Sequence, residues 1–381
     1  MLSRMLLSPR HSVKVRAAVA VSLFSGLALG VQAQVSSSQI DEVFSSLKSA
    51  SAPGLAVLVI RDGKPVFQHG YGVTDLRTLH PIGPETNFRL ASFTKQFTAM
   101  CIMLLVHDGK LHYDEHLTEI FPEFPAYGRN ITVRNLLNHT SGLPDYEDIL
   151  MKQYPNTPPE KIPQILDAGV LKLLEQQSRG EFPPGVKWEY SNSGYAVLAM
   201  IVEKISGKPF GQFLHDRIFA PLQMNNTLAY QNGINEVPNR AYGHKRDGNA
   251  IRETDQSPTS AVLGDGGIYS SLDDLAKWDR ALRKHTLLSE AEMQPALTPV
   301  HVADGPPTSE GRNVSYGFGW FLDPYKGHRR MWHDGETIGF RTTIQRFRDE
   351  NITIIVLANR TDIDPKDLAL KVADLYFSEK R

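Results

Sequence analysis

Cysteine is almost absent from this sequence of 381 residues, and its single copy, Cys101, excludes a disulfide within the chain. Long apolar runs are also scarce. The run at residues 17–29 has 13 residues, whereas about 20 are needed to cross a bilayer. Charge of one sign is lacking too, since 41 Lys and Arg oppose 42 Asp and Glu. We therefore expect a protein stabilised by its apolar core, with no general attraction for nucleic acid.

Several catalytic signatures are missing as well. The sequence has no G-x-S-x-G elbow and no Walker loop, which excludes an α/β-hydrolase and a P-loop nucleotide enzyme. His112 and His116 are four residues apart, the spacing of one helix face, but no H-E-x-x-H, cysteine cluster or third ligand accompanies them. We expect no metal and no cofactor, and keep a metalloenzyme as a minor alternative.

The first 33 residues are typical of an export signal. Basic residues precede the apolar run at four positions, Arg4, Arg10, Lys14 and Arg16. Val31-Gln32-Ala33 fits a small-residue cleavage site. We predict a signal peptide at residues 1–33 and a periplasmic or secreted protein at 34–381, with no stable membrane span after cleavage. A retained N-terminal anchor is the alternative.

Strand patterns lie near both ends of the chain. Apolar, β-rich runs at 54–60 and 65–71 flank the tight turn Asp62-Gly63 and predict a hairpin. Residues 340–347 and 352–358 flank a second polar turn in the same way. A closing helix is expected at 365–377, and mostly helical segments fill the middle of the chain.

These patterns predict an α/β (α+β mixed) fold. Its antiparallel sheet would be built from both chain ends, about 38–110 and 310–381, and flanked by helices. An all-helical insertion would occupy about 111–309.

Ser92-Phe93-Thr94-Lys95 places a hydroxyl three residues before an amine, at the start of an apolar segment. Positions i and i+3 share one face of a helix, so the Ser92 hydroxyl and the Lys95 amine can meet. A partly desolvated lysine can take the proton of a serine that is otherwise a poor nucleophile. The N-terminal N–H groups of a helix running to His107 could hold an oxyanion beside Ser92. We predict that Ser92 is a nucleophile and Lys95 its base.

The S-x-x-K spacing alone is not specific, because Ser45-Ser46-Leu47-Lys48 has it too. The residues after Lys95 are apolar on nearly all sides, which is typical of a buried helix, whereas Ser45 lies in a short amphipathic segment. We interpret Ser45 as part of a solvent-exposed helix face. Cys101, inside the buried helix, is interpreted as a small apolar core residue.

Two further segments carry candidate chemistry. Tyr190-Ser191-Asn192 lies between a Pro-Gly turn and an apolar helix. The phenol could relay a proton if nearby positive charge lowers its pKa from about 10, and the amide could bind a substrate carbonyl. His333-Asp334-Gly335 ends a short strand, where Gly335 lets a substrate backbone approach closely and His333 could move a proton or contact a carboxylate.

In this order, the three motifs beginning at Ser92, Tyr190 and His333 resemble those of the serine β-lactamase and penicillin-binding-protein superfamily. The Y-x-N form is similar to the class C branch. Linking segments at 131–144, 264–271 and 316–320 resemble the same family, and the resemblance covers roughly residues 40 to 378.

The resemblance implies roles for individual residues. Ser92 would be acylated, Lys95 and Tyr190 would move protons, and Asn192 would position the substrate. The backbone N–H groups of Ser92 and Glu336 would form an oxyanion hole, in which one donor is typically worth about a hundredfold in rate. Tyr146 falls where the class C family has a substrate-contacting side chain.

His333 stands where β-lactamases usually have lysine, which puts efficient β-lactam hydrolysis in doubt because a neutral imidazole is a weaker partner for a carboxylate. Arg341 could supply a replacement contact, or be an ordinary solvated strand residue. We therefore expect an exported serine hydrolase that acts on ester or amide substrates and resembles esterases or D-amino-acid peptidases. The alternatives are a true class C-type β-lactamase and a non-catalytic penicillin-recognition protein. We expect a small-molecule or peptide substrate, no nucleic acid partner and a monomer.

Overall fold

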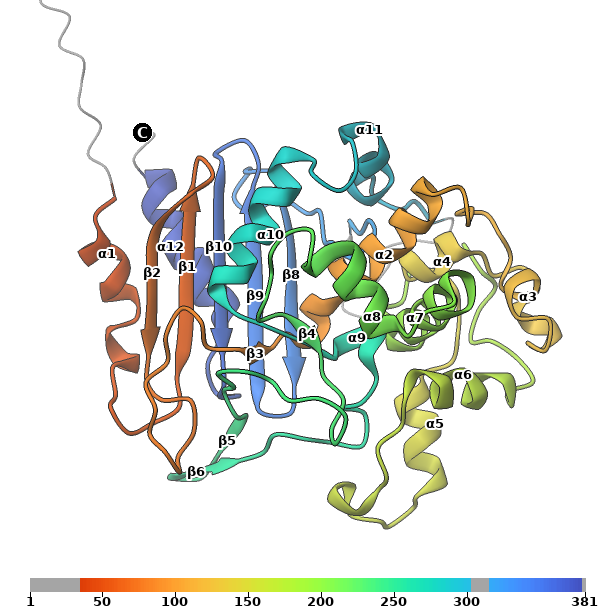
Figure 1. Ribbon diagram of the computed structural model, residues 1–381, viewed down its shortest axis with the longest axis horizontal. Coiled ribbons are helices and arrows are strands. Elements are labelled where there is room, and N and C mark those ends of the chain that lie inside the picture. Colours follow the sequence, from red (N-terminus) through yellow and green to blue (C-terminus); the bar gives the residue numbers. More distant parts are fainter. Residues whose placement is uncertain (1–34, 303–314, 379–381) are drawn as a thin grey trace, which may run out of the picture. The chain divides into compact units, whose positions relative to one another are not determined.

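A five-stranded antiparallel sheet, ordered β2-β1-β10-β9-β8, forms the centre of the structure (Figure 1). The structure is a computed structural model that describes residues 35–302 and 315–378, so the predicted signal peptide lies outside the described residues. The strands are β1 (Leu55–Arg61), β2 (Lys64–Tyr71), β8 (Arg330–Thr337), β9 (Phe340–Phe347) and β10 (Ile352–Ala358). Both predicted strand pairs are confirmed.

The two ends of the chain meet in the middle of this sheet. Strand β1 pairs with β10, with Leu55 opposite Ala358 and Arg61 opposite Ile352. All seven residues of β10 are buried, which requires cover on both faces of the sheet. The predicted sheet built from both chain ends is therefore confirmed.

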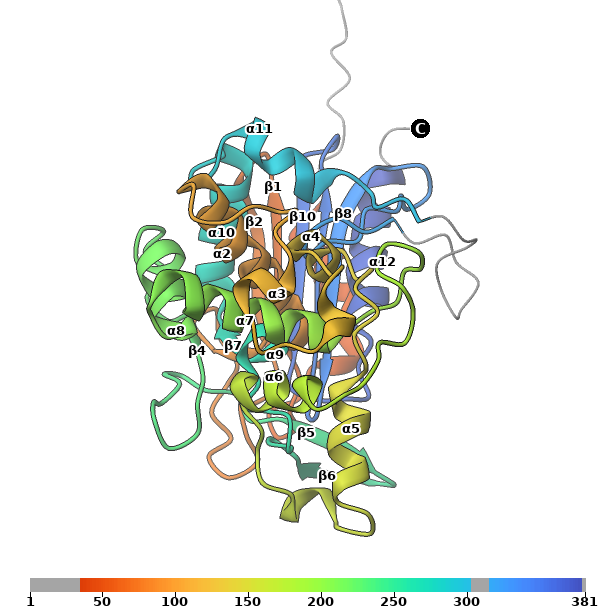
Figure 2. The ribbon, with the colours of Figure 1, turned by 90° about the vertical axis from the view of Figure 1, so that its right-hand side faces the viewer.

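Helices cover the two faces of the sheet (Figures 1 and 2). Alternate side chains of β1 point to opposite faces, as the pleat of a strand dictates. Leu55 and Val57 belong to a cluster with helices α1 (Ser37–Val43) and α12 (Pro365–Ser378). Ala56 and Leu58 belong to the larger core on the other face.

That larger core contains α2 (Lys95–His107) and α10 (Leu272–Lys284). The predicted buried helix is confirmed in α2, whose residues 95–105 are all buried, including Cys101. The helix begins at Lys95 rather than at Ser92, because Ser92 lies in the 3₁₀ turn η2 (Ala91–Thr94) that leads into it.

The middle of the chain is mostly helical. Its α-helices are α3 (Leu117–Ile120), α4 (Val133–Leu137), α5 (Tyr146–Gln153), α6 (Asp167–Glu175), α7 (Asn192–Ser206), α8 (Phe210–Leu214), α9 (Leu263–Gly266) and α11 (Glu290–Met293). Shorter helical turns are η1 (Ser45–Leu47), η3 (Ala126–Gly128), η4 (Pro159–Lys161), the π-helical turn η5 (His215–Phe219) and η6 (Gln294–Leu297). Among the described residues, no helix combines the length and apolar character needed to cross a membrane.

The expectation of an all-helical insertion needs correction, because this region also contains four short strands. These are β4 (Leu228–Ala229), β5 (His244–Asp247), β6 (Ala250–Glu253) and β7 (Ile268–Ser270). Strand β7 pairs with β4 and with β3 (Phe88–Arg89). Strands of two to four residues are too short to give a recognisable period of two in the sequence. The small sheet is nevertheless important, because β3 leads directly to Ser92 and β7 follows α9.

Asn359, just after β10, holds three segments together inside the protein. The residue is fully buried. Its Oδ1 accepts a hydrogen bond from the Gly54 N–H at 2.8 Å, and its Nδ2 donates to the carbonyls of Val73, Thr74 and Tyr242 at 3.0–3.2 Å. One amide thus satisfies buried backbone groups from both ends and the middle of the chain.

We expect Asn359→Ala to lower the free energy of unfolding by about 3 kcal/mol, because the change leaves several buried backbone groups without partners. Chemical denaturation measures the effect. The control is Asn130→Ala at an exposed position, where a change within about 0.5 kcal/mol is expected. Equal losses in the two variants would contradict the proposed role of Asn359.

Candidate active site

Ser92 lies on a strained turn between β3 and α2. The preceding residue, Ala91, has a φ of 51°, in the left-handed region that residues with a Cβ seldom occupy. The turn is fixed on both sides: the Leu90 N–H donates to the Ile268 carbonyl at 2.8 Å, and the Leu90 carbonyl accepts from Thr342 Oγ1 at 2.7 Å. Ala91 and Phe93 are buried while Ser92 stays partly exposed. The backbone therefore presents the Ser92 hydroxyl at the surface of the core.

The amine of Lys95 contacts the Ser92 hydroxyl. Lys95 Nζ lies 3.1 Å from Ser92 Oγ, 2.9 Å from Asn192 Oδ1 and 2.9 Å from the Asp265 carbonyl oxygen. Three elements, α2, α7 and α9, converge on this one nitrogen. Ser92, Lys95 and Asn192, which the sequence predicted as one site, are brought together.

The partners of Lys95 leave it one way to act as a base. The Asn192 and Asp265 oxygens are acceptors, so they hold two N–H bonds of a neutral amine. The remaining lone pair then faces Ser92 Oγ. Complete burial lowers the pKa of Lys95 to about 8, although Asp265 and Glu147 oppose the shift with their negative charge. About a tenth of Lys95 is therefore neutral at pH 7, far more than for an ordinary lysine.

Helix α9 is held in place from its other side. The Leu263 and Gly264 N–H groups donate to the Asp167 carboxyl at 2.8 and 3.0 Å. Gly264 lies so close to α7 that a Cβ would come within 2.3 Å of the Tyr195 carbonyl oxygen. This packing explains the glycine and fixes the Asp265 carbonyl that meets Lys95.

Tyr190 is half-buried beside the amine, with its hydroxyl oxygen fully buried. Lys95 Nζ lies 4.9 Å from the centre of the Tyr190 ring. The sequence leaves open whether nearby positive charge lowers the pKa of Tyr190; in the structure, burial raises this pKa well above its usual value. The phenol is therefore protonated and available as a proton donor. Its oxygen has no hydrogen-bond partner among the described residues.

His139 is a neighbour of Tyr190 that sequence reasoning missed as a site residue. Its ring lies 4.4 Å from that of Tyr190 and 4.6 Å from that of Tyr316, centre to centre. His139 Nδ1 accepts the Ser191 N–H at 3.1 Å, which places the ring proton on Nε2. Burial and the charge of Lys95 lower its pKa well below the usual value, so His139 is neutral. His139 thus packs against Tyr190 and fixes the start of the following helix.

His333 is buried and neutral. Its Nδ1 donates to the Asp334 carbonyl at 2.6 Å, so Nε2 accepts from the Tyr316 hydroxyl at 3.2 Å. Burial and the positive charge of Lys95 lower the pKa of His333 to about 3. The ring therefore brings no positive charge to the site at neutral pH.

The open edge of β8 supplies the backbone donor expected at Glu336. On the side of β8 away from β9, the Trp332 N–H donates to the Phe321 carbonyl, and the Trp332 carbonyl accepts from the Phe321 N–H. Backbone groups alternate along a strand, so Asp334 and Glu336 turn theirs to the same side. A Cβ on Gly335 would lie 2.0 Å from the Leu90 carbonyl oxygen, so its glycine allows β8 to pack against the serine turn. A substrate contact by Gly335 stays a prediction.

Two predicted substrate-contacting side chains have protein partners instead. Tyr146 is buried, and its hydroxyl donates to Asp265 Oδ2 at 2.8 Å. Arg341 Nη2 pairs with Glu336 Oε1 at 2.6 Å, and its Nη1 donates to the Thr337 and Phe340 carbonyls. Tyr146 supports the Lys95 surroundings, while the charge of Arg341 is matched by Glu336.

Glu147 is the second residue that sequence reasoning missed. It follows Tyr146 on the first turn of α5 and is exposed as a whole. Its Oε1 accepts from Asn192 Nδ2 at 3.4 Å. Enclosure of the carboxyl end, with the nearby charges of Asp265 and Asp145, raises its pKa to about 7. An accessible carboxyl group thus lies beside the Asn192 amide, which is predicted to position the substrate. No sequence motif indicates it, because α5 is brought to the site only by folding.

The other candidates lie outside this site. Lys48, of the second S-x-x-K copy, pairs with Asp41 at 2.5 Å on the exposed N-terminal segment. His112 lies before α3 and His116 is the residue that caps it, so they do not share a helix face. Within 35–302 and 315–378, no three His, Cys, Asp or Glu side chains are grouped as metal ligands.

A lysine whose lone pair faces a serine hydroxyl defines a class of enzyme: the protein is a serine hydrolase. Comparison with known proteins gives its family. The family model described as Beta-lactamase matches residues 40–376, so the chain belongs to the β-lactamase family.

Relatives within this family differ in activity. The chain is 33% identical to penicillin-binding protein 4* of Bacillus subtilis, over 84% of this chain and 71% of that protein. It is 30% identical to the D-aminopeptidase of Brucella canis, over 84% of this chain but only 58% of the relative. The D-amino acid amidase of Ochrobactrum anthropi, solved with L-phenylalanine amide, has a TM-score of 0.72 at 25% identity, with 87% and 95% of the two chains covered.

The rate of acylation of Ser92 is expected to rise with pH, with its midpoint near pH 8, because only neutral Lys95 accepts the proton and its pKa is about 8. Pseudo-first-order labelling with a fluorophosphonate between about pH 6 and 10 measures this profile. Glu147→Gln removes a charge that raises the pKa of Lys95, so the midpoint of the pH profile of this variant should move to lower pH. A flat profile in the parent protein would contradict the role of Lys95.

Proposed function

We propose that this protein hydrolyses amide or ester bonds of small substrates that carry a free ammonium group next to the scissile carbonyl, such as amino-acid amides and short peptides. The observation that carries the proposal is the charge of the site. The accessible Glu147 carboxyl lies beside Asn192, whereas His333 is neutral and Arg341 is paired with Glu336. Such a site favours a cationic substrate group over an anionic one.

The reaction would proceed through an acyl-enzyme. Neutral Lys95 takes the Ser92 proton as Oγ attacks the carbonyl carbon, and the oxyanion forms hydrogen bonds with the N–H groups of Ser92 and Glu336. The protonated Tyr190 gives its proton to the leaving nitrogen, and Lys95 returns a proton to Tyr190. Water then attacks the ester formed at Ser92. The same groups transfer protons in the reverse direction, and the acid is released.

Binding of the substrate ammonium would involve a second pair of residues. Asn192 Oδ1 accepts a hydrogen bond from Lys95, and Asn192 Nδ2 donates one to Glu147. A carboxyl group whose pKa is about 7 becomes fully ionised when a cation binds to it. The names of the Brucella and Ochrobactrum relatives, a D-aminopeptidase and a D-amino acid amidase, support substrates of this kind.

A β-lactamase is the second candidate, because the family carries that name. β-Lactams carry a carboxylate, and a permanently charged partner would recognise it best. Because His333 is neutral and Arg341 is paired with Glu336, we expect weak binding of the β-lactam carboxylate.

Glu147→Gln should lower kcat/KM for D-phenylalanine amide about 10- to 100-fold relative to N-acetyl-D-phenylalanine amide, because only the first substrate has an ammonium group to pair with. The ratio of kcat/KM for the two substrates at about pH 7.5 cancels any change at Lys95. Asp148→Asn, at the next and exposed position of α5, is the matched control and should leave the ratio unchanged. Equal losses on both substrates would exclude Glu147 as the ammonium partner.

His333→Lys should shift activity toward nitrocefin and away from neutral p-nitrophenyl esters, since it adds a cation that a β-lactam carboxylate can use. Steady-state rates on both substrates measure the shift. Intact-protein mass after penicillin exposure shows whether an adduct forms on Ser92, with Ser92→Ala as the control. Equal loss on both substrates would instead assign a structural role to His333, and the absence of any adduct or turnover in the parent would overturn the proposed reaction.

A further inference from the structure

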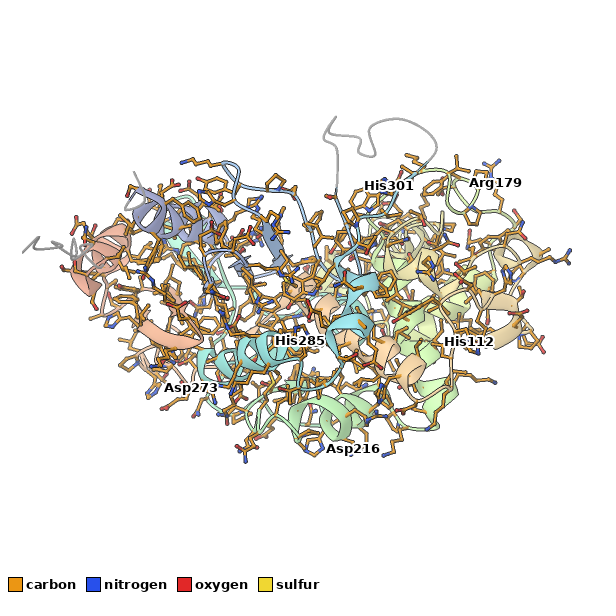
Figure 3. The ribbon with its side chains drawn as sticks, turned by 90° about the horizontal axis from the view of Figure 1, so that it is seen from above. His112, Arg179, Asp216, Asp273, His285 and His301 are labelled. Carbon is orange, nitrogen blue, oxygen red and sulfur yellow. The ribbon has the colours of Figure 1, made fainter. Side chains whose placement is uncertain are left out.

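A second pocket lies between the end of α10 and the sheet, away from Ser92. Its cavity is about 190 Å³ and reaches Met331 on β8. Met331 and Gly335 are four residues apart on the same strand, which corresponds to about 13 Å. None of the residues assigned to the active site lines this cavity. Figure 3 labels His285, which ends α10 at this place.

The polar part of the lining is basic. Three arginines contribute to it, Arg283, Arg346 and Arg348. Asp279 meets two of them: it accepts from Arg346 Nε at 2.8 Å and lies 3.8 Å from Arg283 Nη2. Two guanidinium groups therefore share this carboxylate.

Several donors in this lining are unused. Buried Arg283 Nε and His285 Nδ1 have no hydrogen-bond partner among the described residues. Arg348, whose side chain is exposed, lines the same cavity. Buried polar groups are normally hydrogen-bonded, so unused donors beside a cavity indicate a bound acceptor.

The other side of the cavity is apolar. Leu282, Met293, Leu297 and Met331 contribute side chains to it. A cavity of about 150 Å³ lined by apolar side chains can hold benzene. The present cavity therefore has room for an apolar group of about that size next to its basic side.

We propose that this pocket is a second ligand site, which binds a small organic oxyanion. The anionic group, a carboxylate or a phosphate, would accept hydrogen bonds from Arg283 and Arg348. An apolar group of about the size of a benzene ring would pack against Leu282 and Met293. The site is separate from the reaction at Ser92, so it does not depend on the proposed substrate.

Titration calorimetry with phenyl phosphate and benzoate tests the proposal on the full chain, after Ser92 has been blocked with a fluorophosphonate. We expect both anions to bind, and neutral benzyl alcohol to bind at least about tenfold more weakly, since a charged hydrogen-bonded pair contributes about 1.5–3 kcal/mol. Inorganic phosphate, which lacks the apolar group, should bind more weakly than phenyl phosphate. Phosphate binding as tightly as phenyl phosphate would overturn the apolar half of the proposal.

Arg348→Met and Arg283→Met should each weaken phenyl phosphate binding about tenfold. Arg348 is exposed, so its replacement leaves the fold intact even if Arg283→Met proves unstable through the loss of the Asp279 pair. Arg134→Met, a half-buried arginine that pairs with Asp114 on another part of the protein, is the control and should bind as the parent does. Unchanged affinity in Arg348→Met, or no binding of either anion to the parent, would overturn the site.

Discussion

The burial of the Lys95 amine is the constraint on which the rest of the site depends. An ammonium group taken out of water loses several kcal/mol of hydration free energy, which only well-placed partners can offset. Those partners come from distant segments, Asn192 at the start of α7 and the Asp265 carbonyl in α9. The packing of α2 against α7 and α9 is therefore also the geometry of the base. A shift of any one helix would leave the amine without an acceptor or aim its lone pair away from Ser92.

The position of Ser92 depends on backbone features that resist movement. Ala91 holds a left-handed conformation, which persists only where surrounding contacts enforce it. Leu90 provides them, through hydrogen bonds to β7 and β9 and through the close approach of Gly335. The same contacts bring the free edge of β8 to the serine turn. The predicted nucleophile and the predicted oxyanion donor are thus positioned by one set of contacts.

The sequence predicts the parts of this arrangement that have a local signal. Alternating apolar runs predict the strands, an apolar helix predicts α2, and the three motifs predict Ser92, Tyr190 and His333. Glu147, His139 and Asp265 could not be assigned in this way, because their roles come from segments that meet only in the folded chain. The condition that nearby positive charge lowers the pKa of Tyr190 is not met for a related reason. Burial, which a sequence does not show, raises this pKa.

Burial next to a lysine also limits which charges the site can hold. His139 and His333 both lose their positive charge there, since desolvation and repulsion by Lys95 act in the same direction. A negative group has the opposite balance, because the attraction of Lys95 opposes its desolvation, although burial and the charges of Asp265 and Asp145 still raise the pKa of Glu147 to about 7. The buried lysine thus favours carboxylates as its neighbours. The cationic substrate group that we propose would be recognised through this same balance of charge.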